Sequence, residues 1–141
     1  MRSIKQSNRQ GEKKNNLRLK GKVRLRTMKI KYLSLRIEES LYEEFISVCY
    51  RMGIQYTTAI NLFINKCVEL DNLPFSLSET IQSFLKIIEN EKMKRLSIRV
   101  QEEHYQRFTE ICDRIGIRKS RVVRIFILRC IDKGGLPFDV N

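Results

Sequence analysis

The chain has 141 residues, 42% of them hydrophobic, and a formal net charge of +12. That length suits a single domain, and the positive charge favours a polyanionic partner. No apolar run approaches the roughly 18 residues that a membrane-spanning helix needs, and no signal-peptide pattern is present, so we expect no membrane association and a cytoplasmic location. The positive charge makes nucleic acid, and hence the nucleoid, the simplest polyanionic partner.

The first segment, residues 1–30, is a basic arm. Residues 1–31 carry twelve Lys or Arg and one acidic residue, a net charge of +11. Apolar and basic residues largely alternate from Leu17 to Lys31, so an extra hairpin, a strand extension along DNA, and a segment that stays disordered until DNA binds are all open. An Arg-rich leader also imitates a transit peptide. The expected arm contacts with a polyanion are Arg18, Lys20, Lys22, Arg24, Arg26, Lys29 and Lys31.

The rest of the chain contains the same unit twice. The unit at residues 31–75, KYLSLRIEESLYEEFISVCYRMGIQYTTAINLFINKCVELDNLPF, aligns without a gap with KRLSIRVQEEHYQRFTEICDRIGIRKSRVVRIFILRCIDKGGLPF, 63 positions later. About 45 residues are too few to bury a core alone, so the two units are expected to fold on each other. The predicted divisions are the arm, repeat 1 (31–75), a connector (76–93) and repeat 2 (94–141).

Each unit begins with a short alternating segment. In repeat 1, which we expect to form a strand over Tyr32–Ile37, the inward side chains are Leu33, Leu35 and Ile37. In repeat 2 they are Leu96, Ile98 and Val100. The period of two predicts a strand with one buried and one exposed face.

Two helices should follow each strand. Leu41, Phe45, Val48, Cys49 and Met52 recur at helical spacing and end at Gly53, which predicts a helix over 39–52. A second helix is predicted over 58–71, with Thr57 as its N-cap and Ser120 in the same role in repeat 2. Leu-Pro-Phe then ends each unit, because proline cannot continue the helix and its neighbours can fold back as an apolar latch.

The connector is also predicted to be helical. Ser76 and Glu79 can form a capping box, and Ile81, Phe84, Leu85 and Ile88 share one face. Such a helix either packs on its own domain or offers an apolar stripe to a partner. It also permits either of two assemblies, a monomeric pseudo-dimer or a dimer in which two chains exchange repeats.

A lone strand leaves its backbone unpaired, so we expect the strands of the two repeats to pair antiparallel. The predicted fold class is therefore mainly α with a short two-stranded antiparallel ribbon. Its two repeats form an intramolecular pseudo-dimer and are linked by the additional helix. One face of the ribbon packs on helices, while the polar face stays open, and a two-stranded ribbon fits the DNA major groove. We also expect Arg36 and Arg99 to lie side by side across the ribbon.

The chain resembles the tandem ribbon-helix-helix proteins of the MetJ/Arc type, and its repeats resemble the RelB/DinJ antitoxin branch. The resemblance is carried by LSLRI and LSIRV, by the GIxxT/S turn, and by AINLFINKCVELDNLPF with VVRIFILRCIDKGGLPF. It implies base reading by Tyr32, Ser34, Arg36, Arg95, Ser97 and Arg99. It also implies that the start of each second helix holds a phosphate, which places Tyr56, Thr57, Thr58, Arg118, Lys119, Ser120 and Arg121 at the DNA backbone.

The two predicted phosphate sites differ in charge. Repeat 2 offers Arg118, Lys119 and Arg121, whereas repeat 1 offers only neutral side chains. We therefore expect weaker phosphate binding by repeat 1 and a preference for a non-palindromic DNA site.

Neither a metal site nor an active site is predicted. The four cysteines fall in helical apolar stripes without CxxC spacing, which favours core packing. The single histidine, His104, has no catalytic partners at a matching position, and no phosphate-loop motif is present. We expect no cofactor and no enzymatic activity.

The favoured function is sequence-specific binding of double-stranded DNA by a transcriptional repressor of a bacterium or mobile element. A competing hypothesis is an antitoxin-like protein that binds a toxin or another protein and regulates its own synthesis. Antitoxins of this branch carry a toxin-wrapping segment after the DNA-binding unit, whereas three residues follow Phe138 here, which favours a regulator. The sequence is also compatible with a plasmid relaxosome accessory protein and with a non-specific nucleic-acid binder dominated by the arm.

Overall fold

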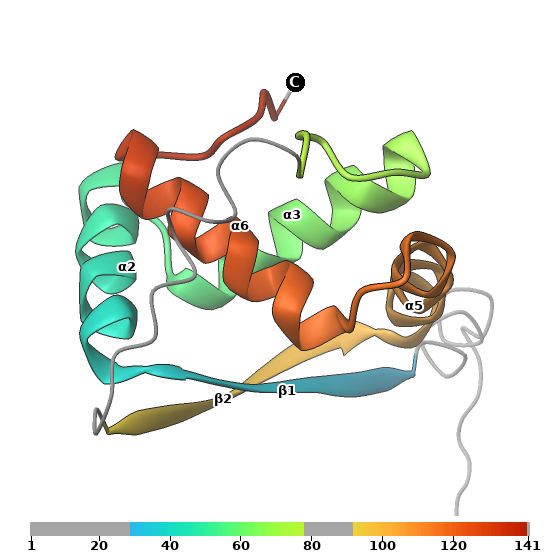
Figure 1. The fold of residues 1–141 in the computed structure, drawn as a ribbon, viewed down its shortest axis with the longest axis horizontal. Coiled ribbons are helices and arrows are strands. Elements are labelled where there is room, and N and C mark those ends of the chain that lie inside the picture. The colour runs from blue at the N-terminus through green and yellow to red at the C-terminus, as the bar shows by residue number, and fades with distance from the viewer. Residues whose placement is uncertain (1–28, 78–91, 141) are drawn as a thin grey trace, which may run out of the picture.

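The computed structural model of the chain describes residues 29–77 and 92–140. In order, the elements are β1 (Ile30–Glu38), α2 (Glu39–Met52), α3 (Tyr56–Leu70), β2 (Met93–Gln101), α5 (Glu102–Ile115) and α6 (Lys119–Lys133). Each half contains a strand followed by two helices (Figure 1). The predicted fold class, mainly helical with a two-stranded antiparallel ribbon built from two repeats, is confirmed. The helix predicted in the connector falls largely on residues 78–91, outside the described residues.

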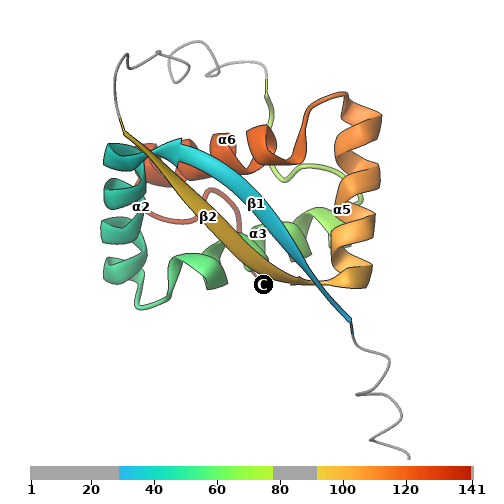
Figure 2. The ribbon, with the colours of Figure 1, turned by 90° about the horizontal axis from the view of Figure 1, so that it is seen from below.

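The ribbon is a single antiparallel pair of nine-residue strands. It crosses one side of the molecule diagonally, and the four helices of the described residues lie behind it (Figure 2). Successive side chains of a strand point to opposite faces, so the alternation seen in the sequence divides the ribbon into an apolar and a polar face. The six predicted inward residues, from Leu33 to Val100, are all buried. Both strands extend beyond the predicted six residues, because backbone pairing continues to Ile30 and Gln101.

The strand register defines an approximate two-fold axis. Ser34 lies opposite Ser97, its own repeat mate, at the centre of the ribbon. Away from that centre repeat mates separate, so Arg36 lies opposite Arg95, and Tyr32 lies opposite Arg99. The prediction that Arg36 and Arg99 lie side by side is therefore wrong. In an antiparallel pair they stand four positions apart, roughly 13 Å along the ribbon.

The two repeats share one core. Phe63 of α3 stacks on its repeat mate Phe126 of α6, with ring centroids 4.5 Å apart and ring planes 9° apart. Phe75, which follows the first proline, stacks on Phe63 at 5.7 Å, and Phe138 lies 6.0 Å from Phe126. The predicted folding back of the Leu-Pro-Phe segments is confirmed. Helix α2 packs on α6, and α3 packs on α5, so each repeat buries its helices against the other.

The starts of α3 and α6 differ from the prediction. Helix α3 begins at Tyr56 after Gln55, α6 begins at Lys119 after Arg118, and no side chain caps either start. Thr57 and Ser120 therefore lie inside the first turn, and their prediction as N-caps is wrong. At the α3 start the Tyr56 ring lies edge-on to the Tyr42 ring, with centroids 5.5 Å apart.

Three of the helices end at a glycine in the left-handed conformation, as the sequence predicts for α2. Gly53 closes α2 with φ 78°, and Gly116 closes α5 with φ 88°. A side chain at this φ is strained, because its Cβ crowds the backbone.

We expect Gly116→Ala to lower the free energy of unfolding by about 1–2 kcal/mol. An added Cβ would meet nothing within 4 Å, so the cost comes from the backbone conformation alone. Gly135→Ala is the matched control, since Gly135 also has open space and lacks a positive φ. Urea unfolding of both variants measures the difference. Equal stability of the two variants would contradict the expected strain.

Candidate nucleic-acid interface

The open face of the ribbon carries every side chain predicted to read bases. Successive outward positions of β1 hold Tyr32, Ser34 and Arg36, and those of β2 hold Arg95, Ser97 and Arg99. All six are exposed, and the aromatic Tyr32 keeps 59% of its surface accessible. Hydroxyl, guanidinium and phenol groups therefore project together from one side of the molecule. No described helix covers that side (Figure 2).

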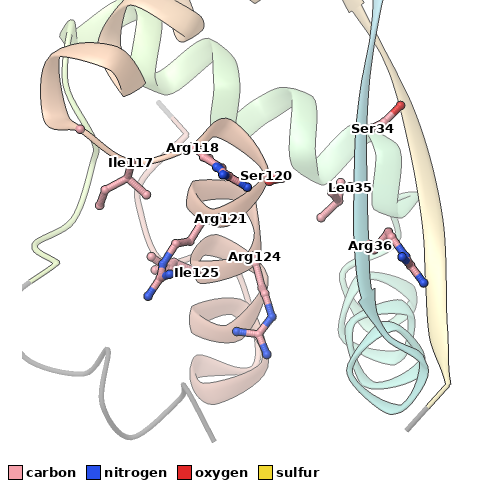
Figure 3. Close-up of a pocket in the computed structure, with 10 residues that line it drawn as sticks. Ser34, Leu35, Arg36, Ile117, Arg118, Ser120, Arg121, Arg124 and Ile125 are labelled. Carbon is pink, nitrogen blue, oxygen red and sulfur yellow. The ribbon is translucent and has the colours of Figure 1, made fainter. Parts of the chain in front are cut away.

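A groove borders the ribbon where β1 passes the start of α6. Its volume is about 880 Å³, and Figure 3 shows its lining. Leu35 points into the groove, while Ser34 and Arg36 point away from α6 toward the open face. Arg118, which immediately precedes α6, and Ser120, on its first turn, are directed toward β1. The groove therefore joins the proposed base-reading face to the predicted phosphate site of repeat 2.

The start of α6 combines backbone donors with positive charge. The N–H groups of a helix's first turn have no partner within the helix, and the helix dipole makes this end electropositive. Arg118 and Arg121 are exposed there, and the ammonium of Lys119 lies 5.2 Å from the ring centroid of Tyr105. Such an arrangement suits an anion such as a DNA phosphate.

The start of α3 is chemically different. Tyr56 and Thr57 border an apolar hollow of about 350 Å³ between α2 and α3. Burial raises the pKa of the Tyr56 phenol, and neighbouring Tyr42 raises it further. Next to the hollow stands Tyr50, which keeps 84% of its surface exposed. The two predicted phosphate sites of different charge thus correspond to a cationic start of α6 and a mostly neutral start of α3.

One cation near the α3 start was not predicted. The ammonium of Lys94, on β2, lies 5.1 Å from the ring centroid of Tyr42, which in turn contacts Tyr56. The signal in the sequence was weak, because Lys94 and its repeat mate Lys31 flank the strands as predicted from the alternation.

A largely buried ion pair was also not predicted. Arg124 of α6 donates from Nη2 to Oε2 of Glu38 at 2.6 Å and from Nε to Oε1 at 3.3 Å. At the symmetry-related place Asn61 of α3 donates to the carbonyl of Arg99 at 2.9 Å. The available signal was a mismatch between the repeats, since position 61 is Asn and its mate 124 is Arg.

Of the predicted arm residues, Lys29 and Lys31 are exposed at the start of the ribbon. Arg18, Lys20, Lys22, Arg24 and Arg26 lie outside the described residues.

The four cysteines are buried, as core packing requires. Burial raises the pKa of Cys49 and of Cys112 to about 11 and raises those of the other two further. Within residues 29–77 and 92–140, no group of three or more His, Cys, Asp or Glu side chains could hold a metal ion. No helix in these ranges combines the length and hydropathy needed to cross a membrane.

Comparison with known proteins gives two matches to one family model, described as RelB antitoxin. They cover residues 30–95 and 93–141, so each repeat is matched separately. No curated protein and no solved structure shows a significant match to the chain.

Proposed function

This chain belongs to the RelB antitoxin family, and from that premise and the open polar ribbon we propose that it binds double-stranded DNA sequence-specifically as a transcriptional repressor. The observation that carries the proposal is the ribbon itself. Its outer face gathers six polar or aromatic side chains, and its inner face is anchored in the core.

The dimensions of the ribbon suit the major groove. Paired strands lie about 4.8 Å apart, and the groove is about 12 Å wide, so the ribbon enters with its side chains directed at the base edges. Arginine can donate two hydrogen bonds to guanine, and serine can donate or accept. Arg36 with Arg95 at one end, and Tyr32 with Arg99 at the other, would then read different base pairs.

Phosphate contacts at both edges would fix the ribbon in the groove. Helix α6 contacts β1 and α3 contacts β2, and the two helices lie on opposite sides of the ribbon (Figure 2). At the α6 start, the DNA phosphates are bound strongly by Arg118, Lys119 and Arg121. At the α3 start, they are bound mainly by the backbone amides of Tyr56, Thr57 and Thr58. Because the two halves differ in their base-contacting side chains and in their phosphate-binding residues, a non-palindromic operator is favoured.

Selection from a random pool of duplex DNA at near-physiological salt tests the proposal. Enrichment of two adjacent, unlike short motifs supports it. Binding without enrichment would instead indicate a non-specific polyanion binder dominated by the basic arm.

Replacing Arg118, Lys119 and Arg121 with alanine should flatten the salt dependence of DNA affinity. Each phosphate contact contributes about 0.9 to the slope of log K against log salt concentration, so the slope should fall by up to about 2–3. Fluorescence anisotropy titrations over a range of salt concentrations measure it.

Thr57→Ala with Thr58→Ala is the matched control at the neutral end and should leave the slope unchanged. Deleting residues 1–28 should also lower the slope without altering the selected sequence, if the arm contacts phosphates alone. An equal slope change for the threonine and the basic variants would contradict the assigned asymmetry.

A second function, binding of a toxin or another protein partner with DNA binding as autoregulation, is favoured by family membership and by the apolar hollow of repeat 1. An exposed tyrosine beside an apolar hollow is a typical protein-binding feature. Tyr50→Ala should then weaken binding of that partner and leave DNA affinity unchanged.

A further inference from the structure

The ion pair between Glu38 and Arg124 joins the two repeats. Glu38 ends β1 of repeat 1, and Arg124 lies on α6 of repeat 2. Two guanidinium N–H groups meet both carboxylate oxygens, and the side chains are only 10% and 18% exposed. Because the bidentate pair has so little access to water, the stability of the fold depends strongly on both partners being present.

The approximate two-fold axis relates the two charged residues to two neutral ones. The repeat mate of Glu38 is Gln101, and the repeat mate of Arg124 is Asn61. Asn61 donates to backbone carbonyls of Thr57 and Arg99 instead of to a carboxylate. The buried charges therefore match only where a repeat 1 strand meets a repeat 2 helix.

Pairing of like repeats would leave these charges without partners. In a ribbon made from two copies of repeat 1, each Glu38 would face an asparagine. In one made from two copies of repeat 2, each Arg124 would face a glutamine. Removing one partner of a buried ion pair is strongly destabilising, because the remaining charge has lost water without gaining a counter-charge.

We propose that Glu38 and Arg124 are specificity residues for assembly, which make the pairing surface of repeat 1 fit repeat 2 and reject a second repeat 1. The rule applies whether the two repeats belong to one chain or to two chains that exchange them. It concerns assembly and does not rest on the proposed DNA binding.

A second ion pair between the repeats lacks this selectivity. Asp71 accepts from Arg114 at 3.3 Å, but the two side chains are 61% and 55% exposed. The repeat mate of Arg114 is Arg51, so Asp71 would also find an arginine in a pair of repeat 1 units. Exposed pairs contribute little stability, which makes this pair a matched control.

Mixing two full-length variants tests the proposal. One chain carries Glu38→Arg and Ser34→Cys, and the other carries Arg124→Glu and Ser97→Cys. Each chain closed on itself places like charges together, whereas exchange of repeats between the two chains gives every charge an opposite partner. The two chains are refolded together from urea, so instability of either closed chain does not prevent the exchanged form.

Disulfide formation reports the exchange. Positions 34 and 97 are directly opposite in the ribbon, where Cα atoms lie about 4.5–5.5 Å apart, within reach of a disulfide. After mild oxidation with glutathione disulfide, a non-reducing gel should show at least about tenfold more cross-linked dimer from the mixture than from a sample of either chain alone. The four native cysteines are buried in the fold and should not cross-link.

Two controls complete the test. Asp71→Arg and Arg114→Asp chains with the same reporter cysteines should give no excess of mixed dimer. A single chain with Glu38→Arg, Arg124→Glu and both reporter cysteines restores the pair in reversed order. It should close on itself and form its disulfide within one chain, without cross-linked dimer. A mixed-dimer yield no higher than that of the Asp71 and Arg114 control, or cross-linked dimer from the double charge reversal, would overturn the proposal.

Discussion

Alanine at both Arg36 and Arg99 should reduce the ratio of specific to non-specific DNA affinity by about a hundredfold or more. Each bidentate contact with guanine contributes roughly 1–3 kcal/mol of discrimination, and 1.4 kcal/mol corresponds to a factor of about ten. Because the two arginines lie toward opposite ends of the ribbon, each single variant should relax preference at a different part of the site. Competition binding with selected and scrambled duplexes measures the ratio.

Arg51→Ala with Arg107→Ala is the matched control. It removes the same charge from exposed helical positions outside the ribbon. We expect it to leave the ratio near that of the unmodified protein. Equal losses for the two double variants would show that total charge, and not the ribbon face, determines affinity.

Phe126→Ala should lower the free energy of unfolding by about 3–5 kcal/mol, the usual cost of deleting a buried phenylalanine. Its ring is fully buried, stacks on Phe63 at 4.5 Å, and meets Phe45 edge-on at 6.1 Å. A domain of this size has a total stability of about 5–15 kcal/mol, so the variant should be at the edge of folding. A shift of the urea midpoint with an unchanged m value measures the loss.

Phe63→Ala should cost about as much, because the two rings are repeat mates in one stack. Tyr50→Ala is the exposed control and should change stability by no more than about 0.5 kcal/mol. A small effect at Phe126 would contradict the shared core, since it would mean that each repeat is stable without the stack.

Much of this fold could be predicted from local patterns in the repeats. Period-two alternation identified Leu33, Leu35 and Ile37 as the buried face of a strand, and the structure confirms it. Helical spacing before Gly53 identified α2 to the residue. These features depend on neighbours in sequence and appear in both copies, so the second copy checks the first.

Features that depend on partners distant in sequence were not predictable. The position of Arg36 relative to Arg99 follows from the register, which no pattern within one strand contains. At the start of α3, Tyr56 contacts the distant Tyr42 ring, and no side chain, including that of Thr57, caps the helix. The pair of Glu38 with Arg124 spans 86 residues, and the only trace of it was a difference between the repeats.

The candidate site divides in the same way. Alternation predicted which ribbon residues are exposed, and the charge imbalance between repeats predicted which helix start is cationic. The sequence could not show that Leu35 and Arg118 face one groove, because they come from different repeats and meet only after the helices have packed. The part of the basic arm before Lys29 and the predicted connector helix remain predictions.

The placement of both strands in one chain has a consequence for dosage. A ribbon assembled from two separate molecules would be lost at low protein concentration by mass action, and under the proposed DNA-binding function the occupied fraction of a site would depend on the square of the number of chains per cell. Here the strands are covalently tethered, so pairing is governed by a fixed effective concentration. For a closed single chain with the proposed repressor function, occupancy of an operator should therefore scale with the first power of the number of chains per cell.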